Sequence, residues 1–323
     1  MKATAGFELI NKLAREKTPF LCVIDFDKSN PLVFPLDTID PAELLYQISG
    51  RGNAKNKLFP DPLCFWNRNP ITKERYRNAF NKVQQHLHYG DTFLLNLTFP
   101  TKLSTNLSLD DIFHSSQAKY KLWLKDQFVT FSPEPFIRIE HGNISSYPMK
   151  GTIRSSVPDA ANAILNDPKE KEEHLTIVDL IRNDLGIVAH DIQVERYRYV
   201  ENVKTAQSDL LQVSSKITGR LQEDFWPNLG DLLERVLPAG SVSGAPKTKT
   251  LEIIKAAEGY NRGYFTGIVG LFDGSTFDSG VMIRFVEQSE DGLIFKSGGG
   301  ITVNSDWEKE YQEMIDKVYV PII

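Results

Sequence analysis

Lys150 stands in the run Tyr-Pro-Met-Lys-Gly-Thr-Ile-Arg at residues 147–154, between a proline and a Gly-Thr pair. Proline fixes one backbone torsion and removes an amide hydrogen, while glycine lets the backbone come close to whatever lies there. A lysine that only solvates a surface is uncommon in such a setting, although an ordinary turn after a strand has the same composition. The run gains weight from four later segments, which could all serve one small substrate with two negative charges.

Two pairs of glutamates could bind a metal ion. Glu170 and Glu173 are three residues apart in a helical pattern, and so are Glu310 and Glu313. This spacing places each pair on one helix face. Mg²⁺ takes oxygen ligands and keeps positions open for water and substrate, so one or two carboxylates from each of two helices would suit it. For each pair alone another explanation stays open, because acidic residues gather at helix N-termini and Glu313 could simply pair with Lys317.

Two glycine-rich segments could hold an anion. Pro238–Lys247 reads PAGSVSGAPK, but a nucleotide-binding P-loop would need glycine and lysine where Ala245 and Pro246 stand. What remains is a tight turn before a helix, whose backbone N–H groups can bind a carboxylate. Ser297–Ile301 reads SGGGI, and consecutive glycines usually mean a backbone pressed against a ligand or another backbone.

Further polar residues could take part in chemistry or in capping. Arg284 interrupts the apolar run VMIRF at 281–285, where it either reaches solvent from a strand edge or clamps a carboxylate. Glu134, in Ser-Pro-Glu after a short strand, is a candidate acid, although an exposed turn carboxylate is the default. Arg182–Gly186 closes the helix that carries the first glutamate pair, and Gly186 is predicted at a left-handed cap.

Hydrophobic spacing predicts the elements that must position these residues. Helices are predicted over 72–88, 169–184, 232–237, 249–257 and 306–318, and strands over 20–25, 92–99, 128–131, 136–140, 210–217, 264–272, 281–286 and 293–296. Residues 50–57 are predicted to form a loop. Strands and helices do not alternate in a strict βαβ rhythm, which favours an α+β fold with antiparallel sheets.

The composition excludes several classes of protein. The 323 residues can bury a large core, as one big domain or two ordinary ones. A formal net charge of −5 without a basic cluster gives no reason to expect nucleic-acid binding. Cys22 and Cys64 are too few for a disulfide framework, and no stretch approaches the roughly 20 apolar residues of a membrane span. Because the N-terminal residues also lack the apolar core of a signal peptide, we expect a cytoplasmic protein.

Eight segments of the chain, in order, resemble the chorismate-utilising enzymes, which include anthranilate, aminodeoxychorismate, isochorismate and salicylate synthases. The resemblance covers about residues 70–320 and rests on SPE, PMKGT, KEKEEHLTIVDLIRNDLG, PAGSVSGAPK, GIVG, IRF, SGGGI and EYQEMIDK. It implies an α+β chorismate-binding fold, with two large antiparallel sheets packed together and helices on the outside. We expect a single domain over 1–323, with a divergent part to about residue 69 and a motif-bearing part over about 70–323.

Two positions within this resemblance favour one branch of the family. Lys150 stands where the anthranilate and isochorismate enzymes usually have alanine, and the lysine form is typical of the aminodeoxychorismate branch. Leu94 stands where isochorismate and salicylate enzymes have a water-activating lysine, so hydration chemistry is disfavoured. Two residues depart from the family pattern: Gln212 replaces a common histidine and cannot shuttle a proton, and Pro135 replaces the arginine that often follows Ser-Pro-Glu.

The resemblance implies amination of chorismate at ring carbon 4 to 4-amino-4-deoxychorismate, on the route to 4-aminobenzoate and folate. It implies Mg²⁺ as cofactor, bound by Glu170, Glu173, Glu310 and Glu313 and holding the ring carboxylate. The implied substrate-binding residues are Thr152, Ser243, Arg284, Gly299, Gly300 and Lys317. Lys150 would attack carbon 2 while the hydroxyl at carbon 4 leaves, protonated by Glu134, and ammonia would then add at carbon 4 and expel the lysine.

Lys150 must be a neutral amine to attack a carbon atom. Deprotonating a free lysine near pH 7.5 costs about 4 kcal/mol. We therefore expect Mg²⁺, a nearby arginine and burial to lower the pKa of Lys150.

Ammonia must come from a second protein, because no cysteine stands in the Gly-x-Cys-x-Gly setting of a glutamine hydrolase. We expect a separate glutamine amidotransferase subunit and, to reach 4-aminobenzoate, a separate pyridoxal-phosphate lyase. Two rival functions stay open, anthranilate synthase component I and a non-catalytic subunit that activates an amidotransferase.

Overall fold

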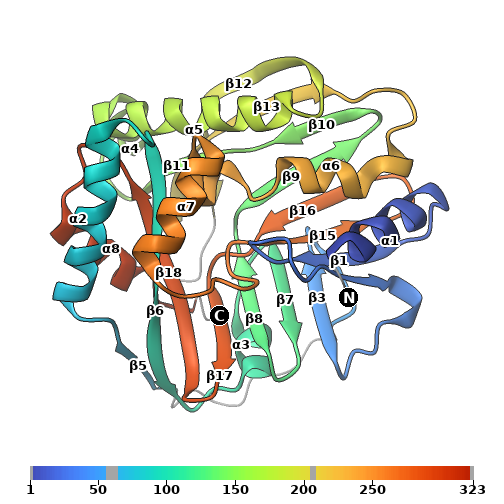
Figure 1. Cartoon of the computed structure of the whole chain (residues 1–323), viewed down its shortest axis with the longest axis horizontal. Coiled ribbons are helices and arrows are strands. Elements are labelled where there is room, and N and C mark those ends of the chain that lie inside the picture. The colour runs from blue at the N-terminus through green and yellow to red at the C-terminus, as the bar shows by residue number, and fades with distance from the viewer. Residues whose placement is uncertain (1–2, 56–64, 204–208, 321–323) are drawn as a thin grey trace.

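Two nine-stranded antiparallel sheets form the centre of the computed structural model, which describes residues 3–55, 65–203 and 209–320 (Figure 1). The first sheet contains, in spatial order, β11 (Met149–Arg154), β13 (Leu210–Arg220), β10 (Asn143–Ser146), β9 (Pro135–Glu140), β16 (Phe277–Val281), β15 (Ile268–Phe272), β1 (Phe20–Ile24) and β2 (Leu32–Pro35), with β12 (His190–Val203) paired to β13. The second contains β14 (Gly244–Ala245), β6 (Leu94–Thr105), β18 (Gly292–Ile301), β17 (Phe285–Ser289), β8 (Phe128–Ser132), β7 (Tyr120–Leu124), β3 (Leu44–Ile48) and β4 (Arg51–Gly52), with β5 (Trp66–Asn69) paired to β6.

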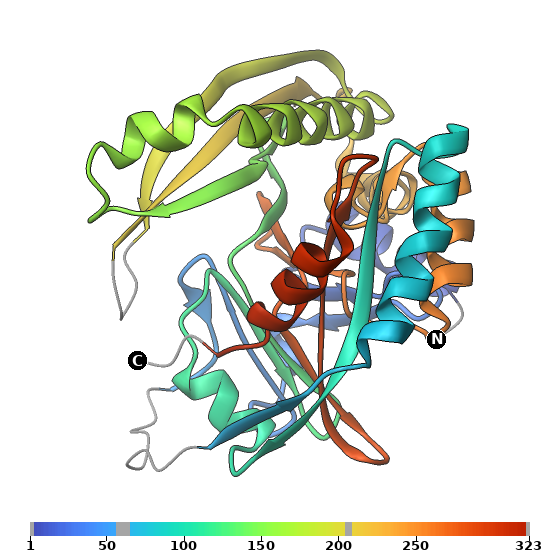
Figure 2. The same cartoon turned by 90° about the vertical axis from the view of Figure 1, so that its left-hand side faces the viewer.

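Helices cover the outer faces of these sheets, as the α+β prediction requires. They are α1 (Ala3–Arg15), α2 (Lys73–Tyr89), α3 (Leu109–Ser115), α4 (Ala160–Asn166), α5 (Pro168–Gly186), α6 (Leu229–Val236), α7 (Lys247–Glu258) and α8 (Trp307–Asp316), with short 3₁₀ turns η1 (Leu36–Thr38), η2 (Trp226–Asn228) and η3 (Gly240–Val242). Helices α1 and α6 pack on the first sheet, and α2, α7 and α8 pack with β6 of the second (Figure 1). Helix α5 contacts β11, β12 and β13 in the upper layer of Figure 2. The predicted fold class is confirmed.

Strand β1 shows how the two sheets are held together. All five residues of Phe20–Ile24 are buried. Alternate side chains, such as Cys22, pack with α1 and α6, while Leu21 and Val23 pack with β3, β7 and β8 of the other sheet. Successive side chains of a strand point to opposite faces, so a continuous apolar run is what a strand covered on both faces needs. Each fully buried large apolar side chain contributes about 1.5–3 kcal/mol.

Side-chain caps fix where the two glutamate-bearing helices begin. The Asp167 side chain accepts a hydrogen bond from the Glu170 amide at the start of α5. The Asp306 side chain accepts from the amides of Glu308 and Lys309 at the start of α8. These bonds satisfy amides that a helix leaves unpaired at its N-terminus. Each glutamate pair therefore begins within the first turn of a capped helix.

The strand predicted over 281–286 is in fact divided. Strand β16 ends at Val281 and β17 begins at Phe285, in the other sheet. Arg284 in the link has φ +54°, a left-handed conformation outside the range of a regular strand. The link carries the chain from one sheet to the other, so an apolar run that reads as one strand contains a crossover.

Other predicted bounds also need correction. Gly186 is the last residue of α5 rather than a left-handed cap, and the capping residue is Ile187 with φ −69°. The strand predicted from residue 264 begins only at Ile268, and the loop predicted over 50–57 contains β4 in its described part. Cys22 is free and buried, whereas Cys64 and residues 56–57 lie outside the described residues. No helix within the described ranges is both long and apolar enough to cross a membrane.

Candidate active site

A cavity of about 570 Å³ is lined by residues of both sheets, of α5 and α8, and of the turn that contains η3. The predicted site residues that line it are Glu134, Lys150, Glu173, Ser243, Arg284, Gly299, Gly300, Glu310 and Lys317. Thr152 is exposed on β11, and neither it nor Glu170 nor Glu313 is among the lining residues. Most of the predicted residues, which are separated by up to more than half of the chain, therefore line one cavity.

Lys150 projects from an irregular part of β11. The pairing of β11 with β13 shifts register between Met149 and Thr152, and Gly151 has φ +90°. A bulge of this kind re-aims a side chain relative to the strand. A Cβ atom at Gly151 would lie 2.9 Å from Oε2 of Glu170. The glycine after Lys150 is thus required both by the backbone conformation and by the neighbouring carboxylate.

Lys150 is held as an ammonium ion by Glu173. The Nζ atom of Lys150 lies 2.6 Å from Oε2 of Glu173, and Lys169 Nζ lies 3.5 Å from the other oxygen. Burial alone would lower the pKa of Lys150, but Glu173, with Glu313 and Glu170 at longer range, outweighs it and raises the pKa. Glu173, a carboxylate predicted to bind metal, thus serves as the counter-ion of the lysine. The expectation that bound Mg²⁺ lowers the pKa of Lys150 stays a prediction.

The other three predicted metal ligands differ in how their charge is met. Burial raises the pKa of Glu170, whose Oε2 atom is buried without a hydrogen-bond partner. Burial also raises the pKa of Glu310, whose Oε1 atom accepts from Ser305 at 3.0 Å. Burial would raise the pKa of Glu313 as well, but Lys317, 2.7 Å away, lowers it. Glu170 and Glu310 are therefore the carboxyls with the most to gain from an added positive charge.

This donor set fits a hard divalent cation. Carboxylate oxygens are the ligands that Mg²⁺ prefers, and the unpartnered Oε2 atom of Glu170 indicates an acidic group without enough positive charge around it. The carboxylates are not drawn into one cluster, since no three His, Cys, Asp or Glu side chains in the described ranges are close enough to hold a metal ion. Lys150 and Lys317 instead take up Glu173 and Glu313. The Mg²⁺ site stays a prediction.

Glu134, half-buried just before β9, faces the same cavity. Its Oε1 atom accepts a hydrogen bond from the Ser241 hydroxyl at 2.7 Å. Burial raises the pKa of Glu134, although the Ser241 hydrogen bond and the positive charges of Arg284 and Lys317 act to lower it. A carboxyl with a raised pKa keeps its proton to higher pH than a free glutamate and can act as a general acid.

Cationic and hydroxyl groups lie on the other walls of the cavity. The Arg284 guanidinium lies 5.3 Å from the centre of the Tyr319 ring, a cation–π distance. Lys317 donates to the carbonyl of Gly298 at 2.8 Å. The Ser243 hydroxyl donates to the Ala239 carbonyl at 2.8 Å, so it also stabilises its own turn.

The three consecutive glycines of β18 have different surroundings, one against another backbone and one towards charged side chains of the cavity wall. A Cβ atom at Gly298 would lie 2.1 Å from the Leu97 carbonyl in β6, so backbone presses on backbone there. A Cβ atom at Gly299 would lie 3.5 Å from carboxylate oxygens of Glu310 and Glu313 and from the Lys317 amine. Gly299 thus opens the strand towards the charged side chains of α8.

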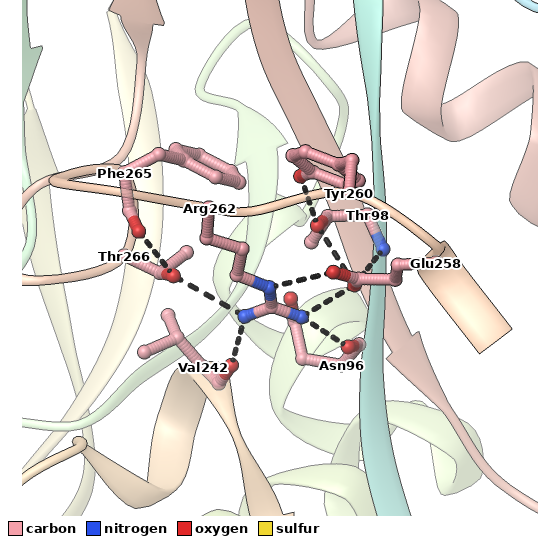
Figure 3. Close-up of polar contacts among 8 residues, drawn as sticks. All are labelled: Asn96, Thr98, Val242, Glu258, Tyr260, Arg262, Phe265 and Thr266. Atoms are coloured by element: carbon pink, nitrogen blue, oxygen red, sulfur yellow. Dashed lines mark hydrogen bonds and ion pairs between the residues drawn. The ribbon is translucent and has the colours of Figure 1, made fainter. Parts of the chain in front are cut away.

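The structure contains a buried ion pair at the cavity floor that the sequence did not predict (Figure 3). Arg262 donates to both oxygens of Glu258 at 2.9 and 2.6 Å, and both side chains are almost fully buried. Arg262 also donates to the carbonyls of Val242 and Asn96 at 2.8 and 2.7 Å. Thr98 donates to Glu258 from its amide and hydroxyl, each at 2.8 Å. The pair therefore ties β6 to the η3 turn beneath the cavity.

A second ion pair that was missed joins Asp184 near the end of α5 to Lys247 at the start of α7, at 2.8 Å. In the sequence, each pair shows only as an acidic and a basic residue near the predicted end or start of a helix. Because Glu, Asp, Lys and Arg are mostly exposed in proteins, such a pattern does not reveal burial.

Comparisons with known proteins agree with this geometry. Residues 52–322 match the family described as chorismate binding enzyme. An uncharacterised PabA-like protein of Haemophilus influenzae is 49% identical over 315 residues, which cover 98% of this chain and 96% of that protein. Aminodeoxychorismate synthase component 1 of Salmonella typhimurium is 34% identical over 269 residues, which cover 78% of this chain and 58% of that protein. The solved structure of the menaquinone-specific isochorismate synthase of Escherichia coli has a TM-score of 0.75 at 16% identity, covering 96% of this chain and 79% of that one, which is a likeness of fold.

The match of the family model over most of the chain, together with the relative of nearly equal length, shows that this protein belongs to the chorismate-binding enzyme family.

Proposed function

We propose that this protein aminates chorismate at ring carbon 4 to give 4-amino-4-deoxychorismate. The observation that carries the proposal is the position of Lys150, an amine that lines the same cavity as the acid Glu134 and the cations Arg284 and Lys317. Nucleophilic amine, proton donor and anion-binding groups are the parts that this amination needs. The relative from Salmonella typhimurium, which is named for this activity, supports the same assignment.

In the proposed reaction the neutral amine of Lys150 forms a bond to carbon 2, both ring double bonds shift by one position, and the carbon–oxygen bond at carbon 4 breaks. Glu134 gives its proton to the departing hydroxyl, which leaves as water. Ammonia then adds to carbon 4, both double bonds return to their first positions, and the bond between carbon 2 and Lys150 breaks. Glu134 takes up the proton released by the added ammonia. The net change is the exchange of one ammonia for one water.

The two carboxylates of chorismate need separate partners. Arg284 and Lys317, with the N–H groups around Gly299 and Gly300, would bind the enolpyruvyl carboxylate, because guanidinium and ammonium groups form strong charge-assisted hydrogen bonds. Ser243 lines the cavity and is a further proposed contact, whereas Thr152 is exposed outside the lining and is no longer proposed as one. Glu170, Glu173, Glu310 and Glu313 would hold Mg²⁺, which when bound polarises the ring carboxylate as a Lewis acid.

Lys150 has to leave Glu173 and lose its proton before it can attack. The raised pKa of this lysine makes that step costly while its counter-ion stays in place. Any event that takes Glu173 away from Lys150, including its proposed use as a metal ligand, lowers the cost.

The ammonia supply implies a partner. No cysteine of this sequence stands in a Gly-x-Cys-x-Gly setting, so we propose that a glutamine amidotransferase subunit delivers ammonia to the cavity. Conversion of the product to 4-aminobenzoate would fall to a separate pyridoxal-phosphate lyase.

The test is a product assay on the purified chain with chorismate, Mg²⁺ and ammonium at about pH 8.5. A separate aminodeoxychorismate lyase is added or withheld, and 4-aminobenzoate is measured against anthranilate. Lys150→Ala should abolish product, and Lys150→Arg, which keeps the charge but not the nucleophile, should do the same. Lys171→Ala is the matched control, because Lys171 is an exposed lysine of α5 outside the cavity lining.

Each outcome separates the proposal from its rivals. 4-Aminobenzoate that appears only with the lyase supports aminodeoxychorismate synthesis. Anthranilate and pyruvate without the lyase would assign the chain to anthranilate synthesis and make Lys150 dispensable. Failure to consume chorismate, with or without an amidotransferase, would favour a non-catalytic subunit.

A further inference from the structure

The Asp184 carboxylate connects three motifs that the proposed reaction uses only in part. Its Oδ1 atom pairs with Lys247 at 2.8 Å, and its Oδ2 atom accepts from the Gly240 amide at 2.9 Å. A Cβ atom at Gly240 would lie 2.9 Å from the same oxygen, so glycine is what allows the carboxylate to reach the backbone there. Asp184 thus links the end of α5, the η3 turn and the start of α7.

The η3 turn in turn holds the proposed acid. Ser241, directly after Gly240, donates its hydroxyl hydrogen to Oε1 of Glu134 at 2.7 Å. Lys247 also donates to the carbonyl of Val236, the last residue of α6, at 2.8 Å, so it joins the two helices between which the turn lies. A hydroxyl that donates to a carboxylate favours the ionised form only while the two groups keep hydrogen-bond geometry.

We propose that Asp184 is a positioning residue that sets the acidity of Glu134 by fixing the η3 turn, so that Ser241 stays within hydrogen-bond distance of the carboxylate. The inference rests on the proposed function only in taking Glu134 as the acid. It means that the motifs around Asp184, Gly240 and Glu134 act together, through one chain of contacts, on the acidity of Glu134.

Charged groups around Glu134 and around Asp184 also affect the pKa values of these two carboxyls. Glu134 is faced by Lys150 from β11, by Arg284 from the link between β16 and β17, and by Lys317 from the end of α8, all of which favour its ionised form. Burial raises the pKa of Asp184, opposed by Lys247 and by the Gly240 amide.

Lys247 itself lies near one more charged group. Lys28 is close enough for Lys247 to lower its pKa, after the larger effect of burial, and Glu234 acts on Lys28 in the opposite sense. Ser241 is the residue of the η3 turn that donates to Glu134, so it is the link that a change at Asp184 would alter.

The test measures the protonation of Glu134 directly in the whole protein. Carbon-13 NMR of protein labelled at glutamate side-chain carboxyls gives the titration of each carboxyl, and Glu134→Gln identifies the signal of interest. Ser241→Ala removes the hydrogen-bond donor and should raise the pKa of Glu134 by about one unit. Asp184→Asn should raise it by about half a unit or more and speed hydrogen exchange of the Gly240 amide, which loses its charged acceptor.

Asp179→Asn is the matched control. Asp179 lies on the same helix and forms an exposed ion pair with Arg182 at 2.8 Å, so its replacement should leave both the Glu134 titration and the Gly240 exchange unchanged. If Asp184→Asn does not fold, Lys247→Met breaks the same ion pair and is measured in the same way.

The outcomes separate this inference from the proposed function. An unchanged Glu134 pKa in a folded Asp184 or Lys247 variant would overturn the positioning role, whatever the enzyme makes. An equal shift in the Asp179 control would also overturn it, because the effect would then be a general one of helix charge. Loss of product in Glu134→Gln is a separate measurement that tests the acid role itself.

Discussion

Replacing Glu173 with glutamine should lower the pKa of Lys150. Two unit charges 2.6 Å apart attract by about 6 kcal/mol at an effective dielectric constant of 20 and by about 2 kcal/mol in bulk water. The side chains of Lys150 and Glu173 keep 36% and 24% of their exposure, so solvent screening favours the lower value. About 2 kcal/mol corresponds to a fall of about 1.5 pKa units.

The assay follows the rate at which Lys150 reacts with acetic anhydride as a function of pH, read by mass spectrometry of its peptide. Exposed Lys171 serves as the internal reference, and Asp179→Asn as a variant that removes a distant acid from the same helix. Burial lowers the pKa of Lys150, and Glu313 and Glu170 still raise it when Glu173 is replaced, so part of the counter-charge remains in the variant.

A midpoint that does not move in Glu173→Gln, or that moves upward, would refute the electrostatic reasoning. The Lys150–Glu173 pair also contributes to the stability of the folded state in a way that depends on pH. Since the folded pKa of Lys150 is raised, the pair stabilises the folded state below the unfolded pKa of about 10.4, and this contribution is lost as pH rises through the folded pKa. Glu173→Gln should therefore destabilise the protein at neutral pH and have less effect in strong base.

Other changes give equally definite expectations. Arg262→Leu should cost about 3–5 kcal/mol in urea unfolding because it leaves the buried Glu258 carboxylate unpaired, and Glu258→Leu in the same chain should recover most of the loss; a single variant as stable as the parent would contradict this. Burial would raise the pKa of Asp273, but hydrogen bonds to its carboxylate outweigh it and lower the pKa. Its contribution is therefore present above the unfolded pKa and lost in acid, so Asp273→Asn should flatten the thermal-stability profile between about pH 4 and 2. Gly298→Ala would place a methyl group 2.1 Å from the Leu97 carbonyl and should lower the melting temperature by several degrees, about 4 °C or more; an unchanged melting temperature would show that β18 can shift.

The helices predicted over 72–88, 169–184, 232–237, 249–257 and 306–318 correspond to α2, α5, α6, α7 and α8, because hydrophobic spacing is a local signal, whereas α1, α3 and α4 were not predicted. The side-chain caps at Asp167 and Asp306 were not predicted either, and the cap predicted at Gly186 is wrong. The crossover at Arg284 was not predictable in the same way. An apolar run fits a strand in either sheet, and only the tertiary structure decides that the chain changes sheets at that residue.

The sequence indicated which residues could form the site but not which of their charged side chains would pair with one another. Lys150, Glu134 and Arg284, which the motifs singled out, line one cavity, and their roles stay predictions. The motifs could not show that Glu173 would pair with Lys150, because pKa values depend on distances between side chains that a sequence does not contain. The Glu258–Arg262 pair was missed for the same reason, since burial of a charged pair is a property of packing.

The charge balance of the cavity wall explains why the four glutamates can stay apart in the folded protein. Lys150 and Lys317 each neutralise one member of a pair, Glu173 and Glu313. Burial raises the pKa of their neighbours Glu170 and Glu310, and the lysines of the cavity wall offset only part of this effect. A divalent cation bound by these glutamates would compete with Lys150 and Lys317 for Glu173 and Glu313, so its binding and the release of the Lys150 amine are expected to be linked.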